Sequence, residues 1–250
     1  MINSVDVIVL TTTRSAELLQ MHMNMLTSFV STRPDNCRLI VLENNAHGSF
    51  QDTFKSEVLG SGMEYHYIDG PFNMNSFFNI GTKLSTSKFV CYANSDIVFY
   101  PEWCENLTRW FSVMPELVCA CPVTMCDSPW SVDAVQNDKS LHLYRSGQVL
   151  QREFVTSYDL AGWFYCFKRE FIYAHPWDER FNAHFQDNDM FKFLEHNHYL
   201  AGVAQDSRVD HIVGGSFSKI SSTEKLKFSA GREAYDNKWD NLSVERDSVA

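Results

Sequence analysis

The sequence predicts a single α/β domain in which a mostly parallel sheet is flanked by helices. Three observations indicate this class. Short apolar runs rich in β-branched and aromatic residues alternate with helix-like segments, which is typical of βαβ units. The length of 250 residues and the apolar fraction of 44% suit one large domain with a substantial core. Several of the apolar runs end abruptly in polar residues, as strands do at the edge of a sheet.

The first half of the chain supplies most of the expected strands. Continuous apolar runs of four to seven residues indicate strands that are buried on both faces. We expect strands at Val5–Leu10, Arg38–Leu42, Tyr65–Ile68, Phe89–Ala93 and Leu117–Val123, with apolar residues resuming at Ile97–Phe99. Helices are predicted from a Ser15 N-cap to about Phe29, from Asn73 to Leu84, and from about Pro101 to Met114.

The second half is less regular. Asp127–Arg152 is polar with few periodic apolar positions, and we interpret it as a long excursion or flexible loop. Strands are expected at Phe164–Phe167 and Tyr199–Ala204, and a short helix at Asp189–His196. The chain turns polar from Ser218, so we predict a domain over residues 1–217 and a polar C-terminal extension, helical or partly disordered, over 218–250.

Composition excludes some functions and favours a compartment. Lysine and arginine total 21 against 31 acidic residues, and a net charge of −10 does not favour broad binding to nucleic-acid phosphates. Seven cysteines are scattered without a C-x-x-C pair, which disfavours a zinc site and suits buried free thiols in a reducing compartment. No secretion signal and no apolar run of about 18 residues is visible. We therefore expect a cytoplasmic protein, of the producing or host cell, without membrane insertion.

Polar segments follow three of the predicted strands: Thr11–Arg14, Glu43–Asn45 and Asn94–Asp96. Sequential βα units bring such segments to one edge of the sheet, where α/β proteins bind ligands. The first two suit recognition of a base and a ribose, and Asp96 suits a divalent cation shared with phosphate oxygens. The alternative is that Asp96 satisfies its own turn. Dinucleotide and P-loop fingerprints are absent, so a bound nucleotide would need a counter-charge such as a metal at Asp96.

Two later segments carry further candidates. Asp187 and Asp189 begin a predicted helix, where the alternative role is N-capping. His211 follows a strand-like segment and could ligate a metal, although a lone histidine is more often structural.

Taken together, these segments resemble the inverting family 2 nucleotide-sugar glycosyltransferases, which have the GT-A fold. The resemblance covers about residues 5–216. The matching segments, in chain order, are VIVLTTTR, VLENN, FNIG, Asn94-Ser95-Asp96 in place of Asp-x-Asp, GWFYCFKREF, FQDNDM, and the His-x-x-Gly-x-Ser pattern of His211–Ser216. The motifs are weak singly, and their order and spacing carry the resemblance.

The resemblance implies roles for individual residues. Asp187 would be the general base, and Asp96 and His211 would hold Mn²⁺ or Mg²⁺. A nucleotide-sugar donor, with a UDP-sugar favoured, would contact Thr11, Thr13, Arg14, Glu43, Asn45, Asn79, Asn94 and Ser95. The donor sugar and the acceptor would meet Gly162, Trp163, Gln186 and Asp189. The chain departs from the pattern at Asn94, which removes a charge beside the metal, and at Gln186, which leaves Asp187 as the only acid at that step.

Two other functions remain open. A nucleotidyltransferase would also use a nucleotide and metal-binding carboxylates, but it needs a basic, glycine-rich loop, and Thr11–Arg14 has one arginine and no glycine. A non-catalytic glycan- or nucleotide-binding module could stack sugars on Trp130, Trp163 or Trp177. For a transferase, the acceptor could be a glycan, a protein, or a hydroxylated base in nucleic acid such as viral DNA.

Overall fold

The computed structural model describes residues 4–46, 48–123, 141–144, 163–182, 184–212 and 230–239. Three features singled out from the sequence lie outside these ranges: Gly162, Trp130, and the part of the His211–Ser216 pattern that follows Ile212. Most of the polar Asp127–Arg152 segment also lies outside them.

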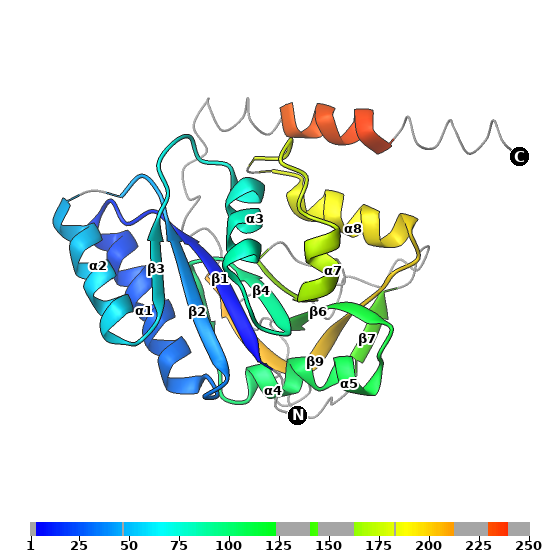
Figure 1. The fold of residues 1–250 in the computed structure, drawn as a ribbon, viewed down its shortest axis with the longest axis horizontal. Helices are drawn as coiled ribbons and strands as arrows, with labels where there is room; N and C mark the ends of the chain where they lie inside the picture. Colours follow the sequence, from blue (N-terminus) through cyan, green and yellow to red (C-terminus); the bar gives the residue numbers. More distant parts are fainter. Residues whose placement is uncertain are drawn as a thin grey trace, which may run out of the picture.

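A nine-stranded sheet forms the centre of the described structure (Figure 1). The strands are β1 (Val5–Thr11), β2 (Cys37–Glu43), β3 (Glu64–Tyr67), β4 (Phe89–Ala93), β5 (Ile97–Phe99), β6 (Leu117–Val123), β7 (Leu141–Tyr144), β8 (Phe164–Lys168) and β9 (Leu200–His211). Their order in space is β3-β2-β1-β4-β8-β6-β9-β5, and β7 pairs with β9. The prediction of a single α/β domain is confirmed.

The two halves of the sheet differ in strand direction. Strands β3, β2, β1 and β4 all run parallel, as the alternation of strands and helices predicts. Strand β8 is antiparallel to both β4 and β6, and β9 is parallel to β6 but antiparallel to β5 and β7. The sheet is therefore mixed, and the expected parallel arrangement describes its N-terminal half.

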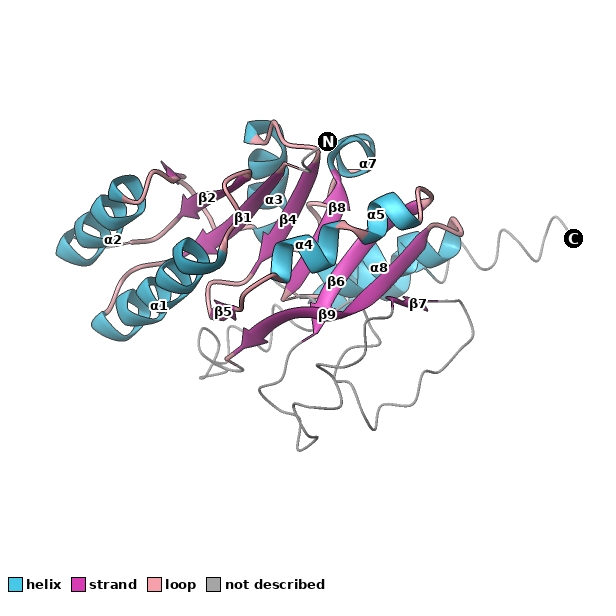
Figure 2. Cartoon of the chain, turned by 90° about the horizontal axis from the view of Figure 1, so that it is seen from below, coloured by secondary structure: helices cyan, strands magenta, loops and turns pink. Residues whose placement is uncertain are grey.

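Helices cover both faces of the sheet (Figure 2). They are α1 (Ala16–Thr32), α2 (Gly48–Gly60), α3 (Met74–Leu84), α4 (Trp103–Thr108), α5 (Trp110–Val113), α7 (Arg169–Ala174), α8 (Gln186–His196) and a further helix at 230–239. Helices α1, α2, α4 and α5 share one apolar core with one face of the sheet, and α3, α7 and α8 share the other core. Two cores fix the positions of the strand ends from both sides.

Several elements differ from the sequence prediction. The helix expected over 101–114 is two short helices that meet at Arg109, and α2 and α7 were not predicted. Strand β7 lies inside the segment interpreted as a loop. Strand β9 continues past Ala204 to His211, because its last part alternates between buried and half-buried residues as it crosses to β5. Between Gln205 and His211 only Val209 is apolar, so the sequence carried no polar–apolar alternation from which this extension could be predicted.

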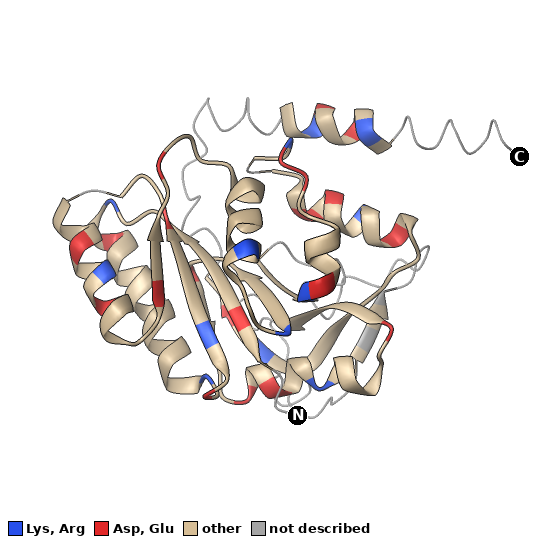
Figure 3. Ribbon diagram, viewed as in Figure 1, with Lys and Arg blue, Asp and Glu red and all other residues tan. Residues whose placement is uncertain are grey.

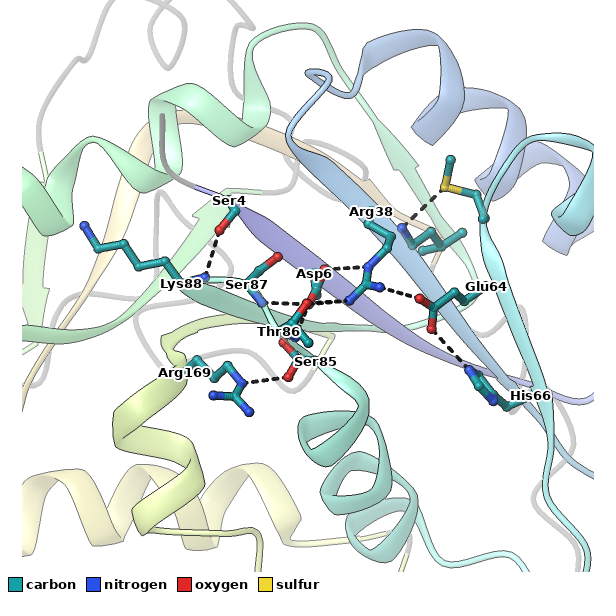
Figure 4. Close-up of polar contacts among 12 residues, drawn as sticks. Ser4, Asp6, Arg38, Glu64, His66, Ser85, Thr86, Ser87, Lys88 and Arg169 are labelled. Atoms are coloured by element: carbon teal, nitrogen blue, oxygen red, sulfur yellow. Dashed lines mark hydrogen bonds and ion pairs between the residues drawn. The ribbon is translucent and has the colours of Figure 1, made fainter. Parts of the chain in front are cut away.

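A buried carboxylate joins three of these elements at the amino end of β1 (Figure 4). Asp6 is fully buried and lies opposite Arg38 in the β1–β2 register, and it accepts hydrogen bonds of 2.9 Å from both Nε and Nη2 of that arginine. It also accepts from the turn between α3 and β4, at 2.7 Å from Ser85 Oγ, 2.9 Å from Thr86 N and 3.1 Å from Ser87 N. Burial raises the pKa of Asp6, but these donors outweigh it and leave the pKa below its ordinary value.

Asp6→Ala should lower the free energy of unfolding by about 3 kcal/mol or more, because it strips a buried arginine contact and several donors of their acceptor. Glu64→Gln is the matched control, since Glu64 is a half-exposed partner of the same arginine and should cost under about 1 kcal/mol. Urea unfolding of the three proteins measures both values. Equal losses in the two variants would contradict the structural role of Asp6.

Candidate functional site

The carboxyl edge of the parallel strands carries a threonine–glutamate cluster. Thr11 and Glu43 are paired in the β1–β2 register, and Thr11 Oγ1 donates to Glu43 Oε2 at 2.7 Å. Thr13 Oγ1 donates to the same oxygen at 2.9 Å, and Thr13 N donates to Oε1 at 2.5 Å. The three side chains are at most 1% exposed. They hold the loop after β1 against the end of β2, and the expected contact with a nucleoside stays a prediction.

His22 of α1 extends this cluster inward. Its Nδ1 lies 2.9 Å from Thr13 Oγ1, its ring packs on Phe54 at 5.3 Å between centroids, and the residue is 1% exposed. Burial lowers the pKa of His22 to about 4, although the negative charge of Asp96 acts in the opposite direction. Sequence reasoning missed His22, yet a signal was present. It lies four residues after Leu18 and three before Met25, on the buried face of the helix.

This buried histidine predicts a pH dependence of stability. The folded-state pKa of about 4 lies below the ordinary value of 6.5, so the unfolded chain takes up the proton first as the pH falls. The free energy of unfolding should therefore drop by up to about 3 kcal/mol between pH 6.5 and 4. Chemical unfolding at several pH values should show this slope in the wild type and lose it in His22→Asn. Burial raises the pKa of Glu43, so this residue makes the free energy of unfolding rise as the pH falls. That contribution is the same in the wild type and in His22→Asn. Identical slopes would contradict the prediction.

Pairing of β5 with β9 builds the second part of the edge. Ile97 pairs with His211, and Ile212 N donates to Asp96 O at 2.8 Å. This register leaves His211 Nε2 3.3 Å from Asp96 Oδ1, with the Asn94 side-chain amide 3.3 Å from the same ring nitrogen. Asp96 is 2% exposed. The structure therefore brings together the two residues predicted as metal ligands, although they are 115 positions apart.

Trp163 orients this pair. Its ring stacks on the His211 ring at 5.8 Å and 10°, and its carbonyl accepts from Asn94 N at 2.9 Å. The residue is 8% exposed, and its indole packs on the imidazole. The expected contact of Trp163 with the donor sugar or the acceptor stays a prediction. Ser95, predicted as a donor contact, is 7% exposed beside Asp96.

The donor set is compatible with a divalent cation. A carboxylate oxygen and an imidazole nitrogen are ligands that Mn²⁺ accepts, and Mg²⁺ takes carboxylate together with phosphate oxygens. Neighbouring ligands of an octahedral ion at about 2.1 Å lie about 3 Å apart, close to the Asp96–His211 spacing. No group of three or more histidine, cysteine, aspartate or glutamate side chains that could hold a metal occurs among the described residues.

Asn79 contacts a neighbouring segment of the chain. Its Nδ2 donates to Trp177 O at 2.9 Å and to Glu179 Oε1 at 3.0 Å, while its Oδ1 accepts from Trp177 N at 2.9 Å. Asn75 Nδ2 and Asn73 Nδ2 donate to the carbonyls of Asp178 and Glu179. Three asparagines of α3 and its N-cap therefore hold the segment that leads to α8. Asn79 uses its amide on this segment, and its expected contact with the donor stays a prediction.

Helix α8 presents the candidate base. It begins at Gln186 after Phe185, whose φ of 64° lies in the left-handed region, and no side chain caps it. The alternative N-capping role of the two aspartates is therefore not what the structure has. Asp187 is half-buried in the first turn and accepts from Asn188 N at 2.9 Å. Gln186 Nε2 lies 3.3 Å from Met74 Sδ at the start of α3, so the first turns of α3 and α8 lie together.

Asp189 faces a different partner. The residue is 5% exposed, and its carboxylate accepts from Trp239 Nε1 at 2.9 Å and from Lys238 Nζ at 2.8 Å. Burial raises the pKa of Asp189, and the hydrogen bonds from these two donors oppose that shift. Asp189 thus attaches the helix at 230–239 to α8, and its expected place in the donor-sugar and acceptor site stays a prediction. Arg14 and Asn45, in contrast, are exposed at the edge.

The sequence matches no family model and no curated protein. The fold, however, matches solved structures. The crystal structure of GalNAc-T7 with UDP, GalNAc and Mn²⁺ superposes with a TM-score of 0.65 at 11% identity, over 84% of this chain and 44% of that chain. The structure of residues 1–349 of S. aureus TarS superposes with a TM-score of 0.59 at 9% identity, over 82% of this chain and 59% of that one. This chain therefore spans about half of those chains, and the GT-A fold predicted from its motifs is confirmed.

Among the residues placed by the structure, no helix combines the length and the apolar character that crossing a membrane requires.

Proposed function

We infer that the chain is a glycosyltransferase that moves a sugar from a nucleoside diphosphate donor, preferably a UDP-sugar, to an acceptor hydroxyl with inversion. The observation that carries the proposal is the Asp96–His211 pair, which lies 3.3 Å apart at the sheet edge where open α/β sheets bind ligands. The superposition on GalNAc-T7 with UDP and Mn²⁺ supports it at the level of the fold. Arg14 and Asn45 are exposed at the same edge and would contact the donor.

Asp96 and His211 would hold Mn²⁺ or Mg²⁺ together with the donor diphosphate, and Asn94 would bind beside them. The cation would supply positive charge against the negative charge that develops on the leaving diphosphate. Trp163 would keep the His211 ring in its orientation through their stacking contact. The Thr11–Thr13–Glu43 cluster would hold the loop that carries Arg14.

Asp187 would serve as the general base. A carboxylate on the far side of the sugar accepts the proton of the acceptor hydroxyl while that oxygen bonds to the anomeric carbon. The bond from that carbon to the diphosphate oxygen breaks in the same displacement, through an oxocarbenium-like state, and one displacement inverts the centre. The acceptor would be a molecule with an exposed hydroxyl, namely a glycan, a protein or a hydroxylated base in nucleic acid. The six cysteines identified as free in the described structure are all buried, which suits a reducing cytoplasmic compartment.

Nucleotide binding tests the proposed metal site. Thermal shift and calorimetry with UDP and UDP-sugars, with and without Mn²⁺, should show metal-dependent stabilisation of about 2.7 kcal/mol at 100 times the dissociation constant. Asp96→Asn should lose the metal-dependent part, because an amide replaces the anionic ligand. Asp236→Asn removes the same charge from the helix at 230–239 and should bind as the wild type does. Equal affinity with and without Mn²⁺ in the wild type would contradict the proposal.

Turnover tests the proposed base. Asp187→Asn should lower kcat by about 10² to 10⁴-fold, because the amide cannot take the proton, while the donor dissociation constant stays within twofold. Asn188→Ala changes the exposed neighbour and should leave both values near wild type. The assay is release of the nucleoside diphosphate from the donor in the presence of acceptor. Near-wild-type turnover in Asp187→Asn would show that Asp187 is not the general base. Donor binding without turnover in the wild type would favour a non-catalytic module.

A further inference from the structure

The helix at 230–239 lies against α8, outside the region that the sequence motifs cover (Figure 1). It carries charges of both signs (Figure 3). Two of its side chains reach a buried acid: Trp239 Nε1 donates to Asp189 Oδ1 at 2.9 Å, and Lys238 Nζ donates to Asp189 Oδ2 at 2.8 Å. We propose that Lys238 and Trp239 are positioning residues for the reaction, because they fix α8 through Asp189 and thereby direct Asp187 into the site.

Helical geometry separates the two aspartates. Residues two apart on an α-helix point about 200° apart around the axis, so Asp187 and Asp189 occupy different flanks of α8. His196 lies seven residues after Asp189 and returns to the same flank, where its ring contacts Trp239 at 5.6 Å. The helix at 230–239 thus contacts one flank of α8 at its first turn and again at its last. Two contacts along one flank fix the rotation of the helix, and so the direction of Asp187 on the other flank.

Contacts at the start of α8 strengthen this attachment. The Phe185 ring lies 5.7 Å from the Tyr235 ring. A side chain in place of Gly231 would put its Cβ 3.2 Å from the carbonyl oxygen of His184, so the helix at 230–239 approaches this backbone closely. Phe185 has the left-handed backbone conformation from which α8 departs. The same helix therefore supports the turn that fixes the start of α8, where Asp187 lies.

Lys238 also connects α8 to the segment before it. Its Nζ donates to Asp178 Oδ2 at 2.9 Å, and the Asp178 carbonyl accepts from Asn75 of α3. One ammonium group therefore bridges two carboxylates, Asp189 on α8 and Asp178 on the segment that α3 holds, and Arg180 supplies a second positive charge at Asp178. Removing it would leave Asp189 as a buried charge with one fewer donor, which is costly enough to displace a helix end. Lys238 thus lies at the junction of three elements that together place Asp187.

The test rests on the proposed function and uses the full chain. Lys238→Met and Trp239→Phe remove one donor each, and Glu233→Met removes a charge from the exposed side of the same helix as a control. We expect kcat to fall at least tenfold in the first two, with the donor KM within twofold, because the proposed donor contacts come from the segments after β1, β2, β4 and β9 and not from this helix. Amide hydrogen exchange over 186–196 should be faster in both. The control should match the wild type, and Lys238→Arg should recover part of kcat.

The outcomes separate the two proposals. If the wild type turns over no nucleotide sugar with any acceptor class, the proposed function fails, and the positioning role falls with it. If the wild type is active and Lys238→Met leaves exchange in α8 unchanged, only the positioning role is overturned. Faster exchange with unchanged kcat also overturns it, because the attachment would then serve stability alone. A rise in donor KM with constant kcat would overturn it too, by assigning the helix to donor binding.

Discussion

Much of this structure depends on one constraint: a carboxylate removed from water must be given hydrogen-bond donors or a cation. Asp6 meets the constraint with Arg38 and the turn before β4, Glu43 with two threonines at and just after the end of β1, and Asp189 with Lys238 and Trp239. Each donor comes from a different part of the chain than the acid. Hydrogen bonds to a buried acid therefore hold together elements that are far apart in the sequence. Asp6 does this at the amino end of β1, Glu43 at the carboxyl end of β1, and Asp189 at the helix at 230–239.

The candidate site follows from a second long-range contact. Antiparallel pairing of β5 with β9 sets Ile97 opposite His211 and so places the imidazole beside Asp96. Strand β5 has only three residues, Ile97–Phe99, and apolar packing against α1 supports it, since Phe99 contacts Phe29. Trp163, just before the start of β8, then stacks on the imidazole. The geometry of the pair thus depends on the register of a short strand and on aromatic packing around it.

Local signals were sufficient for most of the fold. The Ser15 cap, the polar start at Asn73 and the continuous apolar runs located α1, α3 and the parallel strands, because such signals act within one element. The antiparallel insertion of β8 between β4 and β6 had no local signal, since strand direction in a sheet is set by chain connections and tertiary packing. For the site, the predicted ends of the strands placed Glu43 and Asp96 at the same edge of the sheet. The sequence did not indicate whether their oxygens would face a ligand or the interior.

Asn79 and Asp189 show why that distinction matters. Both stand in motifs that resemble ligand-binding segments, and both use their polar atoms inside the chain, Asn79 on Trp177 and Asp189 on Lys238. A motif fixes the position of a side chain along an element, but the partner that reaches it comes from sequence far away. In each case the observed role is to place a neighbour, because Asn79 holds the segment before α8 and Asp189 holds α8 itself. The motifs therefore located these residues along the chain, while their hydrogen-bond partners were set by distant segments that the motifs do not contain.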